Sequence, residues 1–193
     1  YRLIEPGFET WSKMGIYQRC LENYSEKPVM VNDMSDGNCM NCHAFCLNNS
    51  NIMMFHMRAQ HGGTIIYRNN KLEKVNTKTS STISAGVYPS WHPGGSIIAF
   101  SVNNIVQMFH SAPGKKIDVI DTLSDVVIYD TETRKISTCD ALSTKENYET
   151  FPAWSPDGKY LYYCSARAIP LEKYDQVRYD LLKIAFDPVS KQF

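Results

Sequence analysis

An eight-residue pattern occurs twice in this chain and decides its fold. Residues 88–95 read Tyr-Pro-Ser-Trp-His-Pro-Gly-Gly, and residues 151–158, at an offset of 63, read Phe-Pro-Ala-Trp-Ser-Pro-Asp-Gly. The segments that follow, 96–101 and 159–164, are rich in β-branched and aromatic residues. Pro favours the first corner position of a turn, and Gly favours the left-handed position after it. Each copy therefore predicts a strand, a turn and a second strand.

Each copy continues into two further predicted strands. Apolar stretches that end at polar turns occupy 126–133 and 181–188, and a fourth strand is expected at 135–139 and from 191 onward. Four antiparallel strands repeated at this period are typical of a β-propeller blade. The sequence therefore predicts blades at about 86–140 and 150–193.

A more divergent copy precedes these two blades, at about 49–83. Residues 53–57 align with 97–101 at an offset of 44, which places a turn at 48–51 and two more strands at 64–68 and 72–76. The predicted fold class is all-β, a partial β-propeller of four-stranded antiparallel blades, with about three blades in this chain. Because a closed ring needs at least four blades, we expect the chain to form part of a larger propeller.

The string aromatic-Pro-x-Trp-Ser-Pro-Asp-Gly-Lys at 151–159 resembles the repeat of TolB-like β-propellers. The resemblance covers about residues 86–193, and the first copy keeps its turn residues although His92 replaces the serine. It implies a propeller scaffold whose partner is a protein or further blades. Fold alone does not decide which ligand such a scaffold binds.

Residues 1–48 are expected to form a helical and irregular segment ahead of the blades. Apolar residues recur there at steps of three and four, which predicts an amphipathic helix over about 9–24 packed on the side of the propeller. The residues of this face are Trp11, Met14, Tyr17, Leu21 and Tyr24.

The same N-terminal segment carries a C-x-x-C-H motif, Cys-Met-Asn-Cys-His at 39–43. This spacing is typical of covalent haem attachment, because two thiols can each add to a haem vinyl group and the adjacent imidazole can ligate the iron. The motif resembles that of c-type cytochromes in three residues only. The resemblance implies haem c bound through Cys39 and Cys42, with His43 as the proximal iron ligand.

The sixth iron ligand is expected from the loop that follows residues 52–57. His61 is the first candidate, followed by Met57 and His56. In an extended strand His56 and Met57 point to opposite faces, so that both cannot face one iron. Methionines in this stretch also suit core packing, and His61 also suits an exposed loop position.

Three other interpretations of the cysteines stay open. Cys39, Cys42 and His43 together with Cys46 supply four zinc-ligand types, although adjacent Cys42 and His43 suit a tetrahedral site poorly. A redox dithiol is a second alternative, and a thioredoxin-type motif would open a helix after a strand. In the third, the cysteines are structural or disulfide-bonded and His43 lies at the surface.

Strand direction alternates along a blade, which places several loops on one rim. We expect the C-x-x-C-H motif, the connection at 56–63, and two long inserts at 103–124 and 166–178 to share that rim. Loops on a rigid scaffold are where binding function concentrates.

Composition excludes several functions. The 193 residues carry 20 basic and 20 acidic side chains, which gives no electrostatic attraction to nucleic acid. The sequence contains no apolar stretch near the 20 residues of a transmembrane segment, and none of the common hydrolase or nucleotide-binding motifs. The chain starts at Tyr1, compatible with removal of a leader from a periplasmic or otherwise extracytoplasmic protein, which a lipid may anchor to a membrane.

The sequence thus predicts an extracytoplasmic propeller module carrying haem c, which acts in electron transfer or haem-linked sensing with a docked protein partner. The alternative is a haem-free scaffold that binds protein, peptide or glycan. An enzyme whose pocket is completed by further blades is a third possibility, and no residues in this chain point to its chemistry. We also expect haem to be missing from protein made in a host without an attachment system.

Overall fold

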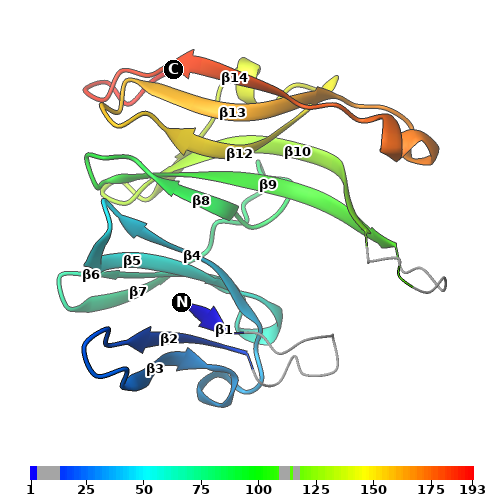
Figure 1. Cartoon of the computed structure of the whole chain (residues 1–193). Helices are drawn as coiled ribbons and strands as arrows, with labels where there is room; N and C mark the ends of the chain where they lie inside the picture. Colours follow the sequence, from blue (N-terminus) through cyan, green and yellow to red (C-terminus); the bar gives the residue numbers. More distant parts are fainter. Residues whose placement is uncertain (4–13, 109–113, 115–117) are drawn as a thin grey trace. The chain divides into compact units, whose positions relative to one another are not determined.

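A computed structural model of the chain describes residues 1–3, 14–108, 114 and 118–193. These residues form antiparallel β-sheets and short 3-10 helices (Figure 1). The chain divides into two compact units: unit 1 comprises 1–45 with 49–76, and unit 2 comprises 46–48 with 77–193. No helix in the described parts is long and apolar enough to cross a membrane.

Unit 1 contains two sheets. The first has the order β1-β2-β3, with bounds Arg2–Leu3, Gly15–Arg19 and Glu26–Val31. The second has the order β4-β5-β6-β7, with bounds Met40–Cys46, Asn49–Met57, Gly63–Arg68 and Lys71–Val75. Unit 1 has one methionine-rich core. Its buried residues are Met14, Ile16, Met40, Met53, Phe55, Met57 and Ile65.

The predicted N-terminal helix is wrong for residues 14–24, and residues 9–13 lie outside the described part. Residues 15–19 form strand β2, in which Met14 and Ile16 are buried on a period of two. Leu21 and Tyr24, expected on the buried helix face, lie in the turn to β3 and are 83% and 67% exposed. Gly15 disfavours a helix and β-branched Ile16 favours a strand, and pairing with β1 and β3 outweighs the helical spacing.

The blade expected at 49–83 is present, and it starts earlier than predicted. Strands β5, β6 and β7 match the predicted second, third and fourth strands. The first strand is β4, joined to β5 by a two-residue turn whose residues, Leu47 and Asn48, have φ of 49° and 57°. The C-x-x-C-H motif therefore lies at the start of a blade strand, and not in an irregular segment before the blades.

Unit 2 contains the two blades that carry the repeated pattern. The first has the order β8-β9-β10-β11, with bounds Val87–Trp91, Ile97–Met108, Asp118–Asp130 and Lys135–Ser137. The second has the order β12-β13-β14, with bounds Asn147–Trp154, Tyr160–Arg167 and Asp180–Ala185. The predicted turns are confirmed, because Gly95 and Gly158 take φ of 76° and 71°. Past β14, Asp187 pairs with Gln192 in an isolated bridge, where a fourth strand was expected.

The two blades of unit 2 pack through a shared core. Its buried residues come from β9, β10, β13 and the segments after β11 and β14: Ile97, Ala99, Val126, Ile128, Leu142, Leu161, Tyr163 and Phe186. His92, at the corner after β8, links the blades: its Nδ1 accepts from Gly94 N at 2.9 Å, and its Nε2 lies 3.0 Å from Gly158 O. His92 therefore has a structural role.

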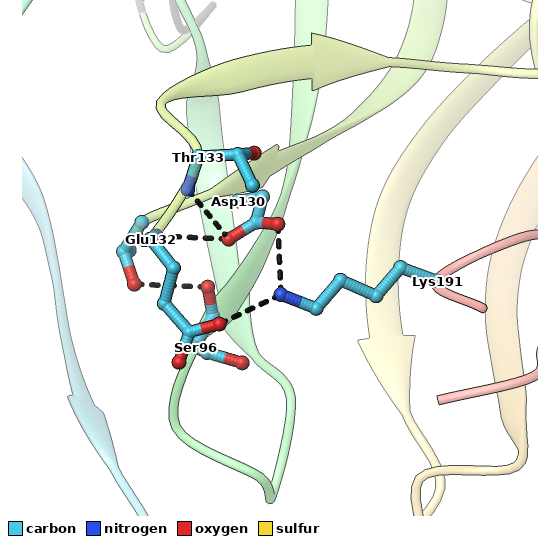
Figure 2. Close-up of polar contacts among 6 residues, drawn as sticks. Ser96, Asp130, Glu132, Thr133 and Lys191 are labelled. Carbon is cyan, nitrogen blue, oxygen red and sulfur yellow. Dashed lines mark hydrogen bonds and ion pairs between the residues drawn. The ribbon is translucent and has the colours of Figure 1, made fainter. Parts of the chain in front are cut away.

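An ion-pair cluster also ties the C-terminal turn to the β10–β11 turn (Figure 2). Lys191 Nζ lies 2.8 Å from both Asp130 Oδ2 and Glu132 Oε2. Burial by itself raises the pKa of Asp130, but hydrogen bonds from Lys191 and from the backbone N–H groups of Glu132 and Thr133 hold that pKa below its ordinary value.

Candidate functional site

The first strands of the two unit 2 blades share a backbone bulge. Strand register shifts between Val87 and Ser90 in β8, and between Thr150 and Ala153 in β12. Inside each shift an aromatic residue takes the left-handed conformation: Tyr88 has φ of 49° and Phe151 has φ of 52°. Such a conformation is uncommon for a bulky residue and costs about 1–3 kcal/mol.

The C-x-x-C-H motif has the same left-handed backbone position in the blade of unit 1. Cys42 has φ of 53° and precedes Phe45 by three residues, as Tyr88 precedes Trp91 and Phe151 precedes Trp154. By this alignment Cys42 replaces the left-handed aromatic residue, and His43 replaces the following proline. The sequence comparison missed this because it aligned the blade only from the second strand onward. The sequence feature that could have revealed this alignment is Phe45, an aromatic residue three positions after Cys42.

The thiols of Cys39 and Cys42 do not form a disulfide, and both residues are half-buried. Cys39 lies at the edge of the unit 1 core, where its Sγ donates to Met14 Sδ at 3.6 Å. The ring of His43 meets that of Phe45 edge-on, with centroids 6.1 Å apart. Both Cys42 and His43 are half-buried, so neither is sealed inside the core.

The loop at 58–61, predicted to hold the sixth iron ligand, is hydrogen-bonded to the N-terminal end of the motif. Arg58 N donates to Cys39 O at 2.8 Å, and His61 N donates to Asn38 Oδ1 at 3.0 Å. His61 Nε2 lies 3.0 Å from Asp36 Oδ2, and its side chain is 44% exposed. The expected neighbourhood is therefore present at the Cys39 end.

The other two proposed ligands are inside the protein. Met57 is buried in the unit 1 core, as predicted for core packing, with Met53 and Met54. His56 is also buried, and its Nδ1 lies 3.3 Å from Thr64 Oγ1. Burial, with a smaller effect of the Arg58 charge, lowers the pKa of His56 to about 4. Ligation by either side chain would require a rearrangement of this core.

The zinc, redox-dithiol and disulfide interpretations receive no support, whereas a structural role of Cys39 agrees with its packing at the edge of the core. Among the described residues, no three or more His, Cys, Asp or Glu side chains are grouped so that they could hold a metal ion, so Cys46 does not complete a zinc site. The motif runs into a strand and not into a helix, unlike a thioredoxin-type dithiol. None of the six cysteines is in a disulfide, so Cys39 is not bonded to Cys42.

Unit 2 contains a cavity of about 420 Å³ where its two inserts meet. It has the size of a small-molecule site. Its walls come from the bulges of β8 and β12, the start of β10, and the segment that follows 3-10 helix η5, Leu171–Gln176. The lining residues are Tyr88, Asp118, Val119, Ile120, Asp121, Tyr148, Phe151, Tyr174, Val177 and Tyr179. This agrees with the prediction that the described parts of 103–124 and 166–178 share one rim.

Aromatic rings and carboxylates dominate this pocket. The rings of Tyr88 and Phe151 lie 4.5 Å apart, tilted by 44°, so the two strained bulge residues form one wall together. Asp121 accepts hydrogen bonds from Asn103 Nδ2, at 2.9 Å, and from Tyr179. Burial still raises the pKa of Asp121, and burial together with the Asp121 charge raises the pKa of Tyr179 to about 12.

Asp118 is the second carboxylate of the pocket. Tyr174 Oη donates to Asp118 Oδ2 at 3.4 Å, which is a long hydrogen bond. A smaller cavity of about 160 Å³ adjoins the pocket and adds Ile169 and Leu171 to its lining. None of the described residues that line either cavity is Lys or Arg.

Comparisons with known proteins show the fold. The chain matches no family model and no curated protein. It is similar in structure to a prolyl endopeptidase, with a TM-score of 0.51 and 17% identity over 88% of this chain and 26% of that chain. TolB from Acinetobacter baumannii matches with a TM-score of 0.38 and 13% identity over 89% of this chain and 49% of TolB.

The chain therefore spans about a quarter of the peptidase and about half of TolB. Together with the four-stranded antiparallel sheets, the likeness shows a partial β-propeller. At this identity it shows nothing about activity.

Proposed function

We propose that this chain is a propeller module that binds its ligand at the rim where the inserts of unit 2 meet. The observation that carries the proposal is the pocket of about 420 Å³ walled by five aromatic rings. A concave site with aromatic walls and a few placed polar groups is the usual form of a ligand site.

The bulges support the same conclusion. Two aromatic residues, Tyr88 and Phe151, are held in a costly left-handed conformation, and both line this pocket. Both are 41% and 49% exposed, so each ring is only partly buried by the protein. Backbone strain that recurs at a binding wall is typical of functional sites.

A ligand screen observed by NMR tests the proposal. Neutral sugars, dipeptides, small amines and carboxylic acids are added to the chain labelled at its tyrosine rings, and shifts of Tyr88, Tyr148 and Tyr179 are followed. We expect one class to shift these rings, and a Phe151→Ser variant to weaken that effect. Tyr160→Ser, an exposed tyrosine on β13 outside the pocket, is the control. No shift at the pocket with any class would overturn the proposal.

Haem c attachment at Cys39 and Cys42 of unit 1 is a second candidate, and it is favoured by two half-buried thiols at the C-x-x-C-H spacing that are not joined in a disulfide. Cys42 occupies a backbone position that carries exposed side chains in the other two blades. Cys39 and Cys42 would hold the haem and His43 would ligate its iron, while His61, whose loop adjoins Cys39, is the candidate for the sixth position. A bound haem would supply one-electron transfer, which suits electron transfer or sensing with a protein partner.

Attachment would replace the contact of Cys39 with Met14. Thioether formation also requires an extracytoplasmic location, as expected for a periplasmic or lipid-anchored protein. The oxidising conditions there are compatible with the cysteine content.

Expression with a haem-attachment system tests the second candidate. We expect covalent haem in the wild type, and clearly less in Cys42→Ala, because one of the two thioether bonds cannot form. Cys164→Ala, a half-buried cysteine of β13, is the control and should keep its haem. Covalent haem retained to the same extent in Cys42→Ala would contradict the assignment. If Cys42→Ala retains less covalent haem, the variants His43→Ala and His61→Ala should each change the absorption spectrum of the bound haem.

A further inference from the structure

A chain of hydrogen bonds connects two walls of the unit 2 pocket across the two blades. Phe151 N donates to Ser101 Oγ at 2.9 Å, and Thr150 Oγ1 donates to the same oxygen at 3.2 Å. Asn103 Nδ2 donates to Thr150 Oγ1 at 3.4 Å and to Asp121 Oδ1 at 2.9 Å. The chain therefore begins at one lining residue, Phe151, and ends at another, Asp121.

The middle of this chain lies behind the pocket. Ser101 and Thr150 are fully buried, and neither they nor Asn103 lines either cavity. Hydrogen bonds in such surroundings are stronger than in water, and linked bonds polarise one another. These three residues can therefore affect a ligand only through the pocket walls that they hold.

We propose that Ser101 and Asn103 are positioning residues for this pocket, where Ser101 holds the Phe151 wall and Asn103 holds the Asp121 carboxylate. The inference rests on the proposed function, and it names buried residues on which ligand affinity depends. A site whose groups are fixed before the ligand arrives loses less free energy in ordering them.

Ser101 supplies the partner that the bulge of β12 requires. Strand pairing between β12 and β13 passes from Thr150 to Ala153, so Phe151 has no opposite residue in β13. Its N–H instead meets the preceding blade, where Ser101 Oγ accepts it. A buried N–H without a partner is costly, so the serine hydroxyl favours the left-handed conformation of Phe151.

This serine is specific to its place in the repeat. The residues that match Ser101 in the other two blades are Met57, at the offset of 44, and Cys164, at the offset of 63. Both sulfur-containing side chains are weak hydrogen-bond acceptors. A hydroxyl at this position is therefore no general requirement of a blade, and it occurs in the blade whose strand β9 contacts Phe151.

Asn103 keeps its orientation at a cost. Its Nδ2 has two acceptors, whereas its buried Oδ1 has no hydrogen-bond partner. A buried acceptor without a partner is unfavourable, so the contacts of Nδ2 must outweigh that loss. Burial raises the pKa of Asp121, and the hydrogen bond from Asn103 opposes that rise by stabilising the ionised carboxylate.

The first test compares Ser101→Ala with Ser90→Ala. Ser90 Oγ accepts from Trp154 N at 3.2 Å, so both variants remove a hydroxyl that binds a backbone N–H of β12, but Trp154 does not line the pocket. A strong NOE between the amide and Hα protons of one residue reports a positive φ. We expect this NOE at Phe151 to weaken in Ser101→Ala and to persist in Ser90→Ala and in Ser101→Thr, which keeps the hydroxyl.

A second variant covers the case in which Ser101→Ala does not fold. Ser101→Cys keeps the volume and replaces the hydroxyl by a weak acceptor, as at Cys164. An undiminished NOE at Phe151 in either folded variant would overturn the role of Ser101.

The test of Asn103 is the pKa of its carboxylate partner. Asn103→Ala is titrated while the carboxyl ¹³C shifts are followed, and we expect the pKa of Asp121 to rise further, because the ionised form loses a donor. The pKa of Asp125, which burial raises, is the internal control and should not change. An unchanged pKa of Asp121 would show that Asn103 does not hold the carboxylate.

Binding then connects both residues to the ligand. One probe of each screened class, namely glucose, Ala-Ala, butylamine and butyrate, is titrated into the wild type and the variants, and the ring shifts of Tyr148 and Tyr179 are followed. We expect about five- to tenfold weaker binding in Ser101→Ala and in Asn103→Ala, and unchanged binding in Ser90→Ala.

The outcomes separate this inference from the proposed function. If a probe binds the wild type and the two variants equally, the pocket is a binding site and the positioning roles are wrong. If no probe shifts the pocket tyrosines of the wild type, both proposals fail.

Discussion

The blades of unit 1 and unit 2 use one backbone device for two different sets of side chains. In β8 and β12 the left-handed residue is aromatic and forms a pocket wall, whereas in β4 it is Cys42 of a C-x-x-C-H motif. The left-handed position therefore recurs in all three blades, whereas its residue type differs between the units. The predictions below test how far the two units depend on their different residues.

The largest difference is expected between two left-handed glycines, one in each unit. A Cβ added at Gly158 would lie 2.3 Å from His92 Nε2, whereas one added at Gly37 would meet nothing within 4 Å. Both have positive φ, 71° and 77°, so both alanine variants carry conformational strain. Gly158→Ala must also displace the histidine that links the blades of unit 2.

We therefore expect Gly158→Ala to lower the free energy of unfolding by about 3 kcal/mol, and Gly37→Ala by about 1 kcal/mol. Tryptophan fluorescence in urea, measured with Trp11 replaced by Phe in every variant, follows unit 2, where Trp91 and Trp154 lie. Hydrogen exchange of β4–β7 amides follows unit 1. Equal losses in the two variants would show that the link through His92 contributes little.

The second prediction concerns the buried histidine of unit 1. His56 has a pKa of about 4 when folded, below its ordinary value near 6.5, because burial disfavours the charged ring. Between about pH 4 and pH 6.5, His56 is therefore protonated in the unfolded chain and neutral in the folded chain. Stability is fully present above about pH 6.5 and is lost as the pH falls toward 4, by about 2 kcal/mol between pH 7 and pH 5.

Hydrogen exchange of the β5 amides at pH 7 and pH 5 measures this loss. In His56→Phe the pH dependence should be smaller by about that amount, whatever the variant does to stability at pH 7. His61→Ala is the matched control, because that ring is 44% exposed. An unchanged pH dependence in His56→Phe would mean that His56 is not buried and neutral in the folded state.

Much of the fold was predictable from local chemistry, and the failures have physical reasons. The Pro-x-Gly turns and apolar strands located the blades of unit 2, since turn residues impose their backbone angles locally. The apolar residues at 14, 17, 21 and 24 fit a helix by spacing, but strand pairing with β1 and β3 decides the fold of 15–19. The spacing of apolar residues within one segment does not show which distant segments that segment will pair with.

The candidate sites, like the fold, were predictable only in part. The two inserts were recognisable as binding loops from their length and position, because long loops on a repeating scaffold break the repeat. The pocket itself was not predictable, since Tyr88 and Tyr179 are far apart in sequence and face one another only after blade packing. For the C-x-x-C-H motif, the residue types were evident and the left-handed position was not, because cysteine gives no signal for a left-handed backbone.

The third prediction tests whether Cys42 is present for stability or for chemistry. Glycine takes φ near 53° without a Cβ penalty, so Cys42→Gly should stabilise unit 1 by up to about 1 kcal/mol. Cys164→Gly, in the interior of strand β13, should destabilise unit 2 by a similar amount, because glycine is unfavourable in a regular strand. Phe151→Gly relieves the same strain but loses the ring contact with Tyr88.

Hydrogen exchange of β4 and β5 amides measures the first change, and urea unfolding followed by tryptophan fluorescence measures the other two. A higher stability of unit 1 in Cys42→Gly would mean that the cysteine at this position destabilises the fold. A loss comparable to that of Cys164→Gly would mean that the Cys42 side chain packs like an ordinary strand residue.

The smallest effect is expected at the ion-pair cluster of unit 2. Asp130→Asn removes the charge that Lys191 contacts, and should lower the apparent Tm of unit 2 by about 2–4 °C at pH 7. Because hydrogen bonds hold the folded pKa of Asp130 below its ordinary value, this stabilisation is present above about pH 4 and is lost as the pH falls through the folded pKa. The Tm difference between wild type and variant should therefore narrow below pH 4. Glu132→Gln, which alters the more exposed partner of Lys191, should change the Tm less, and a larger effect there would place the stabilising contact at Glu132 instead.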